Sequence, residues 1–248
     1  INNVLTKIIY IPRTSNPISK FISFFKTYLS EINKIGDFDC AGFNRAAPKE
    51  PTENPEDIFG ILPKLRTDQY DMNEIIKRLV DDSQFEPYKD GHGKTLICGY
   101  ARIDGWAVGI VANERLSTKN AQGELHIGGV IYSDSANKAA RFIANCNQKN
   151  IPLVFMQDVT GFMVGSRAEH GGIIKDGAKM VNAMANSVVP KFSVVIGNSY
   201  GAGNYAMCGK AYDPRLIVAW PTAEIAVMSG AAAAKTLLQI EVAKLKAK

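Results

Sequence analysis

Two apolar runs in the second half of the chain each lead directly into a glycine-rich segment. Residues 192–196 are apolar apart from one serine, and the small residues of 197–203 follow at once. Residues 151–157 form a second run of this kind, followed by 158–165 with two glycines. A short apolar run bounded by glycine is typical of a buried strand. The pattern predicts two strand, glycine loop and helix units in tandem.

Tandem units of this kind place their strands in parallel within one α/β sheet. Both glycine loops then lie at the carboxyl ends of their strands, where open α/β sheets bind ligands. We therefore expect the loops 158–172 and 197–205 to lie side by side at one sheet edge. A helix is expected to open at 169–172 and to continue to Val189.

The second loop has the composition of an oxyanion hole. It joins a strand to a helix N-terminus, where backbone N–H groups have no partner within the helix. Glycine and alanine at 201–203 would let a ligand oxygen approach these groups closely. The alternative is a glycine turn that only packs a helix against a sheet, which is common in α/β proteins. Gly203 is expected on a surface turn.

The preceding part of the chain also alternates strands and helices. The Asp104-Gly105 pair separates two β-rich runs and predicts a hairpin of 95–102 with 106–112. Apolar positions recur at helical spacing over 133–148. The side chains of that helix expected to face inward are Ala139, Phe142, Ile143 and Cys146. Further predictions are a helix at 72–81, a loop at 113–129, a strand at 215–219 and a helix at 231–248 that is cut short.

The N-terminal part lacks this order. Residues 1–16 are apolar and irregular, and 19–34 have helical spacing. We interpret 19–34 as the remnant of a helix that joined a preceding domain, with an amphipathic helix docking on a partner as the alternative. Four prolines punctuate 46–63 and predict a linker.

Composition narrows the class of protein. With 46% hydrophobic and 21% charged residues, the 248 residues hold enough apolar material for one core. No apolar run approaches the roughly 20 residues that span a bilayer. The net charge of +5 is spread along the chain, which argues against nucleic acid as a partner. The cysteines, Cys40, Cys98, Cys146 and Cys208, have neither zinc-site nor disulfide spacing and are expected to be reduced and mostly buried.

No side-chain nucleophile or metal mechanism is indicated. The chain has no Gly-x-Ser-x-Gly elbow, no HExxH and no phosphate-loop lysine, and His92, His126 and His170 are dispersed. His170 is interpreted as a surface or packing residue rather than a base. Electrostatic catalysis by backbone amides remains, in which one donor contributes on the order of 3 kcal/mol.

Four segments resemble, in the same order, motifs of the carboxyltransferase subunit of biotin-dependent acyl-CoA carboxylases. These segments are 158–165, 177–180, 197–209 and 220–228. The resemblance extends from about Ala41 to Gln239, and the methylcrotonoyl-CoA type is the most similar branch. It implies a crotonase-like α/β spiral. The chain then divides into an atypical N-terminal segment at 1–40, a proline-rich linker at 41–70 and a C-terminal carboxyltransferase domain at 71–248.

The resemblance assigns carboxyl transfer to backbone amides. In this family N-carboxybiotin gives its carboxyl group to an acyl-CoA, and two oxyanion holes, one in each half of the protein, stabilise the negative charge. By motif match, the amides of Ala202 and Gly203 would hold the ureido oxygen of biotin. Residues expected to shape the turn or to line the biotin and substrate cleft are Gly161, Phe162, Gly165, Tyr200, Gly201, Asn204 and Tyr205. Inward packing is the alternative for Phe162 and Tyr205.

The resemblance also implies partners. Biotin would be carried on a biotin carboxylase or biotin carboxyl carrier subunit, the substrate would be a coenzyme A thioester, and an N-terminal carboxyltransferase domain would complete the cleft. We expect a homo-oligomer, located in the cytoplasm or, in a eukaryote, in the mitochondrial matrix, and inactive without its N-terminal half. A biotin-dependent decarboxylase subunit and a catalytically silent scaffold are the alternatives. The Tyr-Gly-Ala-Gly-Asn-Tyr run at 200–205 favours the carboxylase over the decarboxylase.

Overall fold

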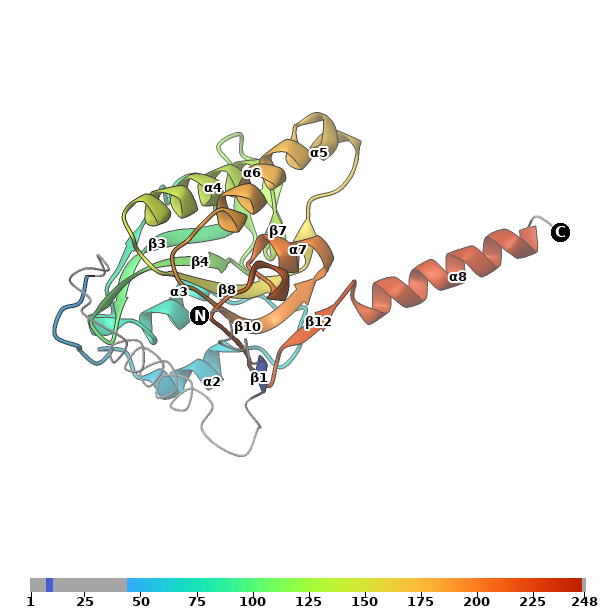
Figure 1. The fold of residues 1–248 in the computed structure, drawn as a ribbon. Helices are drawn as coiled ribbons and strands as arrows, with labels where there is room; N and C mark the ends of the chain where they lie inside the picture. Colours follow the sequence, from blue (N-terminus) through green and yellow to red (C-terminus); the bar gives the residue numbers. More distant parts are fainter. Residues whose placement is uncertain (1–7, 11–43, 247–248) are drawn as a thin grey trace.

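The centre of the structure is a sheet with helices on both faces (Figure 1). The structure, a computed structural model, describes residues 8–10 and 44–246. Across the sheet the strands are β1 (Ile8–Tyr10), β11 (Leu216–Ala219), β10 (Lys191–Tyr200), β8 (Leu153–Val159), β4 (Trp106–Asn113), β3 (Leu96–Ile103) and β2 (Phe85–Pro87), and β12 (Glu224–Ala226) pairs with the end of β10.

The tandem units form the parallel part of this sheet, as predicted. The strands from β4 through β8, β10 and β11 to β1 pair in parallel. Strands β3 and β2 continue the sheet in antiparallel pairing. Every residue of β8 is buried, which suits a central strand covered by other elements on both faces.

A separate hydrophobic core lies on each face of the sheet. Helices α4 (Ser133–Gln148) and α6 (Ile173–Ala185) cover one face, where Phe142 and Met180 belong to the same core as Phe155 of β8. Helices α2 (Ile58–Ile61) and α3 (Met72–Lys77) lie at the opposite face, with Ile58, Ile75 and Trp220 in that core.

Local sequence signals predict several elements closely. Strands β3 and β4 form the expected hairpin, and Asp104 and Gly105 turn it with φ of +53° and +79°, values typical of a type I′ turn. Helix α4 spans the predicted residues, and all four side chains expected to face inward are buried. The helix predicted at 72–81 is α3, which ends four residues earlier at Lys77 and is followed by η2 (Asp81–Ser83).

The prediction of one helix from 169–172 to Val189 is wrong. Two helices, α5 (Ser166–His170) and α6, occupy this region. Gly172 lies between them with a left-handed φ of +95°, which a regular right-handed helix does not contain. Helix α6 ends at Ala185, and Val189 is buried in the connection to β10.

The turn predicted directly after Ile196 is also wrong, because β10 continues to Tyr200. The pairing of β10 with β8 shifts register between Val195 and Ser199. On its other edge, β10 pairs with β11 over 192–195 and with β12 over 198–200. An irregularity in the strand, rather than a turn, therefore occupies 196–198.

Small elements fill the connections. These are β5 (Thr118–Lys119), β6 (Leu125–His126), β7 (Val130–Ile131), β9 (Gly161–Phe162), α7 (Gly201–Ala206), η1 (Pro55–Asp57) and η3 (Lys210–Tyr212). The predicted loop 113–129 thus contains the β5–β6 pair, and the linker region contains η1 and α2. Residues 8–10, expected to be irregular, form the edge strand β1. The predicted helix at 19–34 and Cys40 lie outside the described residues.

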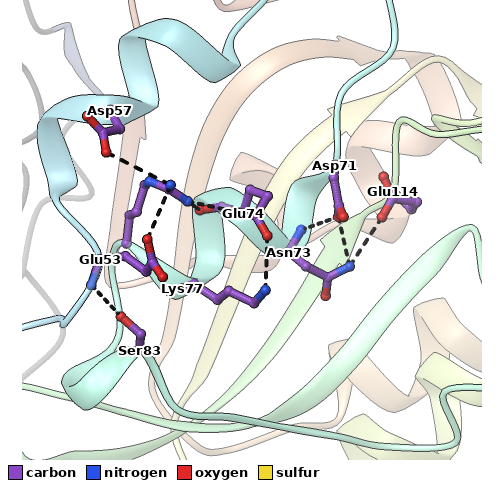
Figure 2. A network of polar contacts seen from close by, with 9 residues as sticks. Glu53, Asp57, Asp71, Asn73, Glu74, Lys77, Ser83 and Glu114 are labelled. Carbon is purple, nitrogen blue, oxygen red and sulfur yellow. Dashed lines mark hydrogen bonds and ion pairs between the residues drawn. The ribbon is translucent and has the colours of Figure 1, made fainter.

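A polar network ties the linker region and α3 to the sheet (Figure 2). Arg78 Nη1 donates to Glu74 Oε2 at 2.8 Å, and Arg78 Nη2 donates to Glu53 Oε2 at 3.4 Å. At the other end of α3, the buried Glu114 accepts from the Leu116 N–H at 2.9 Å and lies 3.5 Å from Asn73 Nδ2. Glu114, directly after β4, thereby links the start of α3 to the sheet, and Arg78 links the other end of α3 to the linker region.

Helix α8 (Gly230–Lys246) extends away from the rest of the molecule (Figure 1), and none of its residues is buried. Large apolar side chains such as Leu237, Leu238 and Leu245 are exposed along it. Within the described ranges, no helix is long and apolar enough to cross a membrane.

Glu114 makes the stability of the fold depend on pH. Burial raises the pKa of its carboxyl to about 7, while an unfolded chain leaves a glutamate near its ordinary pKa. The folded state thus binds the Glu114 proton more tightly than the unfolded state does. The stabilisation that comes from the protonated carboxyl is lost as pH rises from the ordinary glutamate pKa to about 7. Relative to Glu114→Gln, the wild type should lose about 1 kcal/mol or more of unfolding free energy between pH 5 and pH 8 in urea titrations. Glu86→Gln, on the exposed side of β2, is the matched control and should leave the pH dependence unchanged.

Candidate functional site

The two glycine loops meet at the carboxyl ends of β8 and β10, as predicted. Ser199 of β10 is in register with Val159 of β8, directly before the loops begin. A Cβ atom on Gly203 would lie 2.6 Å from Val159 Cγ2 and 3.3 Å from Gly161 Cα. The second loop therefore packs directly on the first.

Gly201 makes the turn from strand to helix. It has a left-handed φ of +48°, and a Cβ there would lie 2.9 Å from the Val227 carbonyl oxygen. Glycine meets both conditions without strain. The amides of Ala202 and Gly203 follow in the first turn of α7, where N–H groups have no acceptor within the helix.

Ala202 and Gly203 differ in their surroundings. Ala202 is exposed, whereas Gly203 is buried against Val159 and Gly161. The expectation that Gly203 lies on a surface turn is therefore wrong. The close contact between the two loops requires glycine at position 203, because any side chain there would overlap with Val159.

An apolar groove of about 430 Å³ lies beside α7. Phe162, Ala202 and Tyr205 line it together with apolar residues of α6, among them Ile173, Ile174 and Val181. The Phe162 ring lies against α6 because Gly177 has no side chain, since a Cβ there would lie 2.9 Å from the ring. Phe162 is thus half-buried and forms part of the groove wall.

A second cleft, of about 620 Å³, continues from this groove and shares Met163, Val164 and Ile173 with it. Gly165, with a φ of +107°, lies in its wall. His126 also lines it, with its ring stacked on Tyr132 at a centroid distance of 3.7 Å. No pattern in the sequence predicts this stacked pair.

The predicted site residues on the second loop point in different directions. Tyr205 is 52% exposed and lines the groove, in edge contact with Tyr212, so it does not pack inward. Asn204 turns inward and donates from Nδ2 to Ser199 Oγ at 2.8 Å. The Tyr200 hydroxyl donates to Asn198 Oδ1 at 3.1 Å, and Tyr200 lines neither the groove nor the second cleft.

A buried carboxylate that the sequence analysis missed connects the two loops. Asp158 is 5% exposed at the end of β8 and accepts from the Asn198 N–H at 2.9 Å and from the Tyr70 hydroxyl at 2.8 Å. Arg115 forms an ion pair with it at 3.4 Å. Burial raises the pKa of Asp158, and the Arg115 charge opposes that shift. The position of Asp158 directly after the apolar run 151–157 could have indicated a buried carboxylate.

The remaining titratable candidates do not form a catalytic group. Burial raises the pKa of the Cys208 thiol to about 11, so it stays protonated at neutral pH. Cys98 and Cys146 are likewise buried free thiols, as expected. His170 is exposed on α5 and lines neither the groove nor the second cleft.

Comparisons with known proteins identify the family of the chain. A family model described as the carboxyl transferase domain matches residues 21–248. A probable mitochondrial methylcrotonoyl-CoA carboxylase beta chain of Drosophila melanogaster is 48% identical over 195 residues, covering 79% of this chain and 31% of that protein. The biotin-dependent 3-methylcrotonyl-coenzyme A carboxylase beta1 subunit of Mycobacterium tuberculosis is 46% identical, over 80% of this chain and 35% of that protein. The chain thus spans about a third of the length of these relatives.

Solved structures show the same fold. The beta subunit of P. aeruginosa geranyl-CoA carboxylase superposes with a TM-score of 0.72 at 40% identity, covering 88% of this chain and 40% of that one. The transcarboxylase 12S structure superposes with a TM-score of 0.69 at 35% identity, over 80% of this chain and 36% of that one. The predicted crotonase-like α/β fold is confirmed.

The contact between the two loops can be tested by filling it. Gly203→Ala should destabilise the chain by about 1–3 kcal/mol, because the new methyl group overlaps with Val159. Val159→Ala removes the obstructing methyl groups, so the double variant should lose less stability than the sum of the two single variants. Urea unfolding of the four proteins measures this coupling. If the two losses of unfolding free energy are strictly additive, the methyl group at position 203 does not contact the Val159 side chain.

Proposed function

The chain belongs to the carboxyl transferase domain family of biotin-dependent acyl-CoA carboxylases, and we propose that it forms the biotin-binding half of such an enzyme. The amides of Ala202 and Gly203 would donate hydrogen bonds to the ureido oxygen of biotin. The main supporting observation is that both amides lie in the first turn of α7 and that Ala202 lines an apolar groove.

The lining of the groove suits the chemistry of the proposed ligand. The tetrahydrothiophene ring of biotin is apolar, and Phe162 and Tyr205 offer aromatic walls for it beside Ala202. N-carboxybiotin supplies the carboxyl group when bound. The chain would contribute fixed dipoles, which stabilise the negative charge that grows on the ureido oxygen as the carboxyl group leaves. Gly161 and Gly165 would keep the first loop close to the ligand, while Tyr200, Gly201 and Asn204 hold the turn.

The comparisons also suggest partners and substrate. Biotin would be carried on a biotin carboxylase or biotin carboxyl carrier subunit, and an N-terminal carboxyltransferase domain would supply the donors for the thioester oxygen. The acyl-CoA would be of the methylcrotonoyl type, carboxylated at its α- or γ-carbon, since relatives at 46–48% identity carry that name. The enzyme would be a homo-oligomer, cytoplasmic or, in a eukaryote, in the mitochondrial matrix, where the Drosophila relative is named.

Reconstitution tests the proposed half-site. The isolated chain should not carboxylate methylcrotonoyl-CoA, because it lacks the thioester donors, but it should do so when combined with an N-terminal carboxyltransferase half and carboxybiotin. Incorporation of labelled bicarbonate carbon into the acyl-CoA measures the reaction. Equal turnover by the isolated chain contradicts the proposal. Decarboxylation of a carboxylated acyl-CoA without net carboxylation would favour the decarboxylase alternative.

Removal of one backbone donor tests the oxyanion hole in the reconstituted enzyme. Ala202→Pro deletes the N–H, and proline is tolerated in the first turn of a helix, so turnover should fall by about 10²–10³-fold while the fold persists. Ala202→Ser is the matched control, since it keeps the amide and should stay within a few-fold of wild type. His170→Ala should also stay within a few-fold. A hundredfold loss in His170→Ala would indicate acid–base catalysis instead.

A further inference from the structure

Gln157 lies in β8 directly before Asp158, and the other five residues of the strand are apolar. Gln157 is fully buried, yet both ends of its side-chain amide have partners. Its Oε1 accepts from the Ser199 hydroxyl at 2.6 Å, and its Nε2 donates to the Met207 carbonyl oxygen at 2.6 Å. A buried amide is tolerated only when it is paired in this way, and the pairing fixes one arrangement of the surrounding elements.

The two partners of Gln157 lie on either side of α7. Ser199 comes two residues before the helix begins, and Met207 is the residue at which it ends. Ser199 Oγ also accepts from Asn204 Nδ2 at 2.8 Å, so the middle of the helix is held as well. Gln157 therefore bonds the end of α7 directly through Met207 O, and it reaches Asn204 within the helix through Ser199 of β10.

Helix α7 is short, so its orientation depends on its contacts with the rest of the chain. It has six residues, and helices of this length are not stable in water on their own. Ala202 and Tyr205 face the groove and are exposed, which leaves Gly203 and Ala206 as its buried residues. Packing holds one side of the helix, where Gly203 lies against Val159 and Gly161. The polar contacts of Gln157 and Ser199 add directional hydrogen bonds to this packing, and together they set the direction of the first amides of α7.

We propose that Gln157 is a positioning residue for the carboxyl transfer, an inference that rests on the proposed function of α7. It acts through Ser199, Asn204 and Met207 O, and does not touch the ligand. Its amide holds α7 so that the N–H groups of Ala202 and Gly203 point into the space beside the groove. Donors of this kind act only when they are aimed in advance at the oxygen that becomes negative, so a small rotation of α7 lowers turnover without preventing binding.

Gln157→Leu tests this role, because leucine fills a similar volume with no polar atom. In the reconstituted enzyme we expect kcat to fall about 10-fold to 100-fold, while the KM for the acyl-CoA changes less than about threefold. Thr95→Val is the matched control, since it removes a buried hydroxyl that bonds Ser135 Oγ at 3.0 Å, away from α7. Its kcat should remain within about twofold. A kcat for Gln157→Leu within threefold of wild type overturns the proposal.

Gln157→Glu adds a readout that a purely structural role would not produce. A protonated glutamic acid has the shape of glutamine and can donate to Met207 O, whereas the carboxylate can only accept. Because burial raises the pKa of a carboxyl, kcat of this variant should rise towards the wild-type value as pH falls. Wild type and Gln157→Leu should lack this rise. A pH profile of kcat for Gln157→Glu that runs parallel to that of wild type contradicts the proposal. This test remains available if the Gln157→Leu variant does not fold.

Hydrogen exchange separates this inference from the proposed function. In the assembled enzyme, peptides covering 199–207 should exchange faster in Gln157→Leu than in wild type, and at the wild-type rate in Thr95→Val. If the wild-type assembly shows no carboxyl transfer, the proposed function fails while exchange still decides whether Gln157 holds α7. Unchanged exchange over 199–207 refutes the positioning role, whatever the activity.

Discussion

A buried charge holds the two halves of the candidate site together. The Asp158 carboxylate lies where β10 loses its pairing with β8, and it accepts the Asn198 N–H that this irregularity leaves available. Gly197 makes room for it, since a Cβ there would overlap with the carboxylate. A charge in this environment is costly unless all its partners are present. The ends of β8 and β10, and the segment that carries Tyr70, must therefore adopt one mutual arrangement, from which both loops extend.

The sequence predicts those features that local patterns encode. Segments of about fifteen residues or fewer are enough to recognise the helical spacing of α4, the Asp104-Gly105 turn and the apolar runs of β8 and β10. Each of these elements is present in the structure. The glycines of the two loops also indicate where the site lies. From the glycine pattern alone, the second loop is either a site of hydrogen-bond donors or a turn that packs a helix against the sheet. The resemblance to a known family favours the first alternative.

The features that the sequence did not predict depend on distant contacts. Gly172 interrupts a helical pattern that its neighbours support, and the end of β10 is set by pairing with β12, about 25 residues further along the chain. Gly203 reads as a surface residue until Val159 is placed against it. Gln157 is a polar residue at the end of the apolar run 151–157. Its contacts are with Ser199 and Met207, which lie 42 and 50 residues away in the sequence. No local period carries such information.

Helix α8 differs from the rest of the chain in what sustains it. It has seventeen residues and buries none of them, so among the residues that the structure describes its backbone ladder and intrahelical contacts such as Lys244 with Glu241 are what favour the helical state. The formation of such a helix is a helix–coil equilibrium, which is marginal at this length and shifts gradually with temperature. Calorimetry of the chain alone would therefore record one cooperative heat absorption from the sheet and its two cores. The melting of α8 would spread over a broad range of temperature as a separate, non-cooperative loss of circular dichroism.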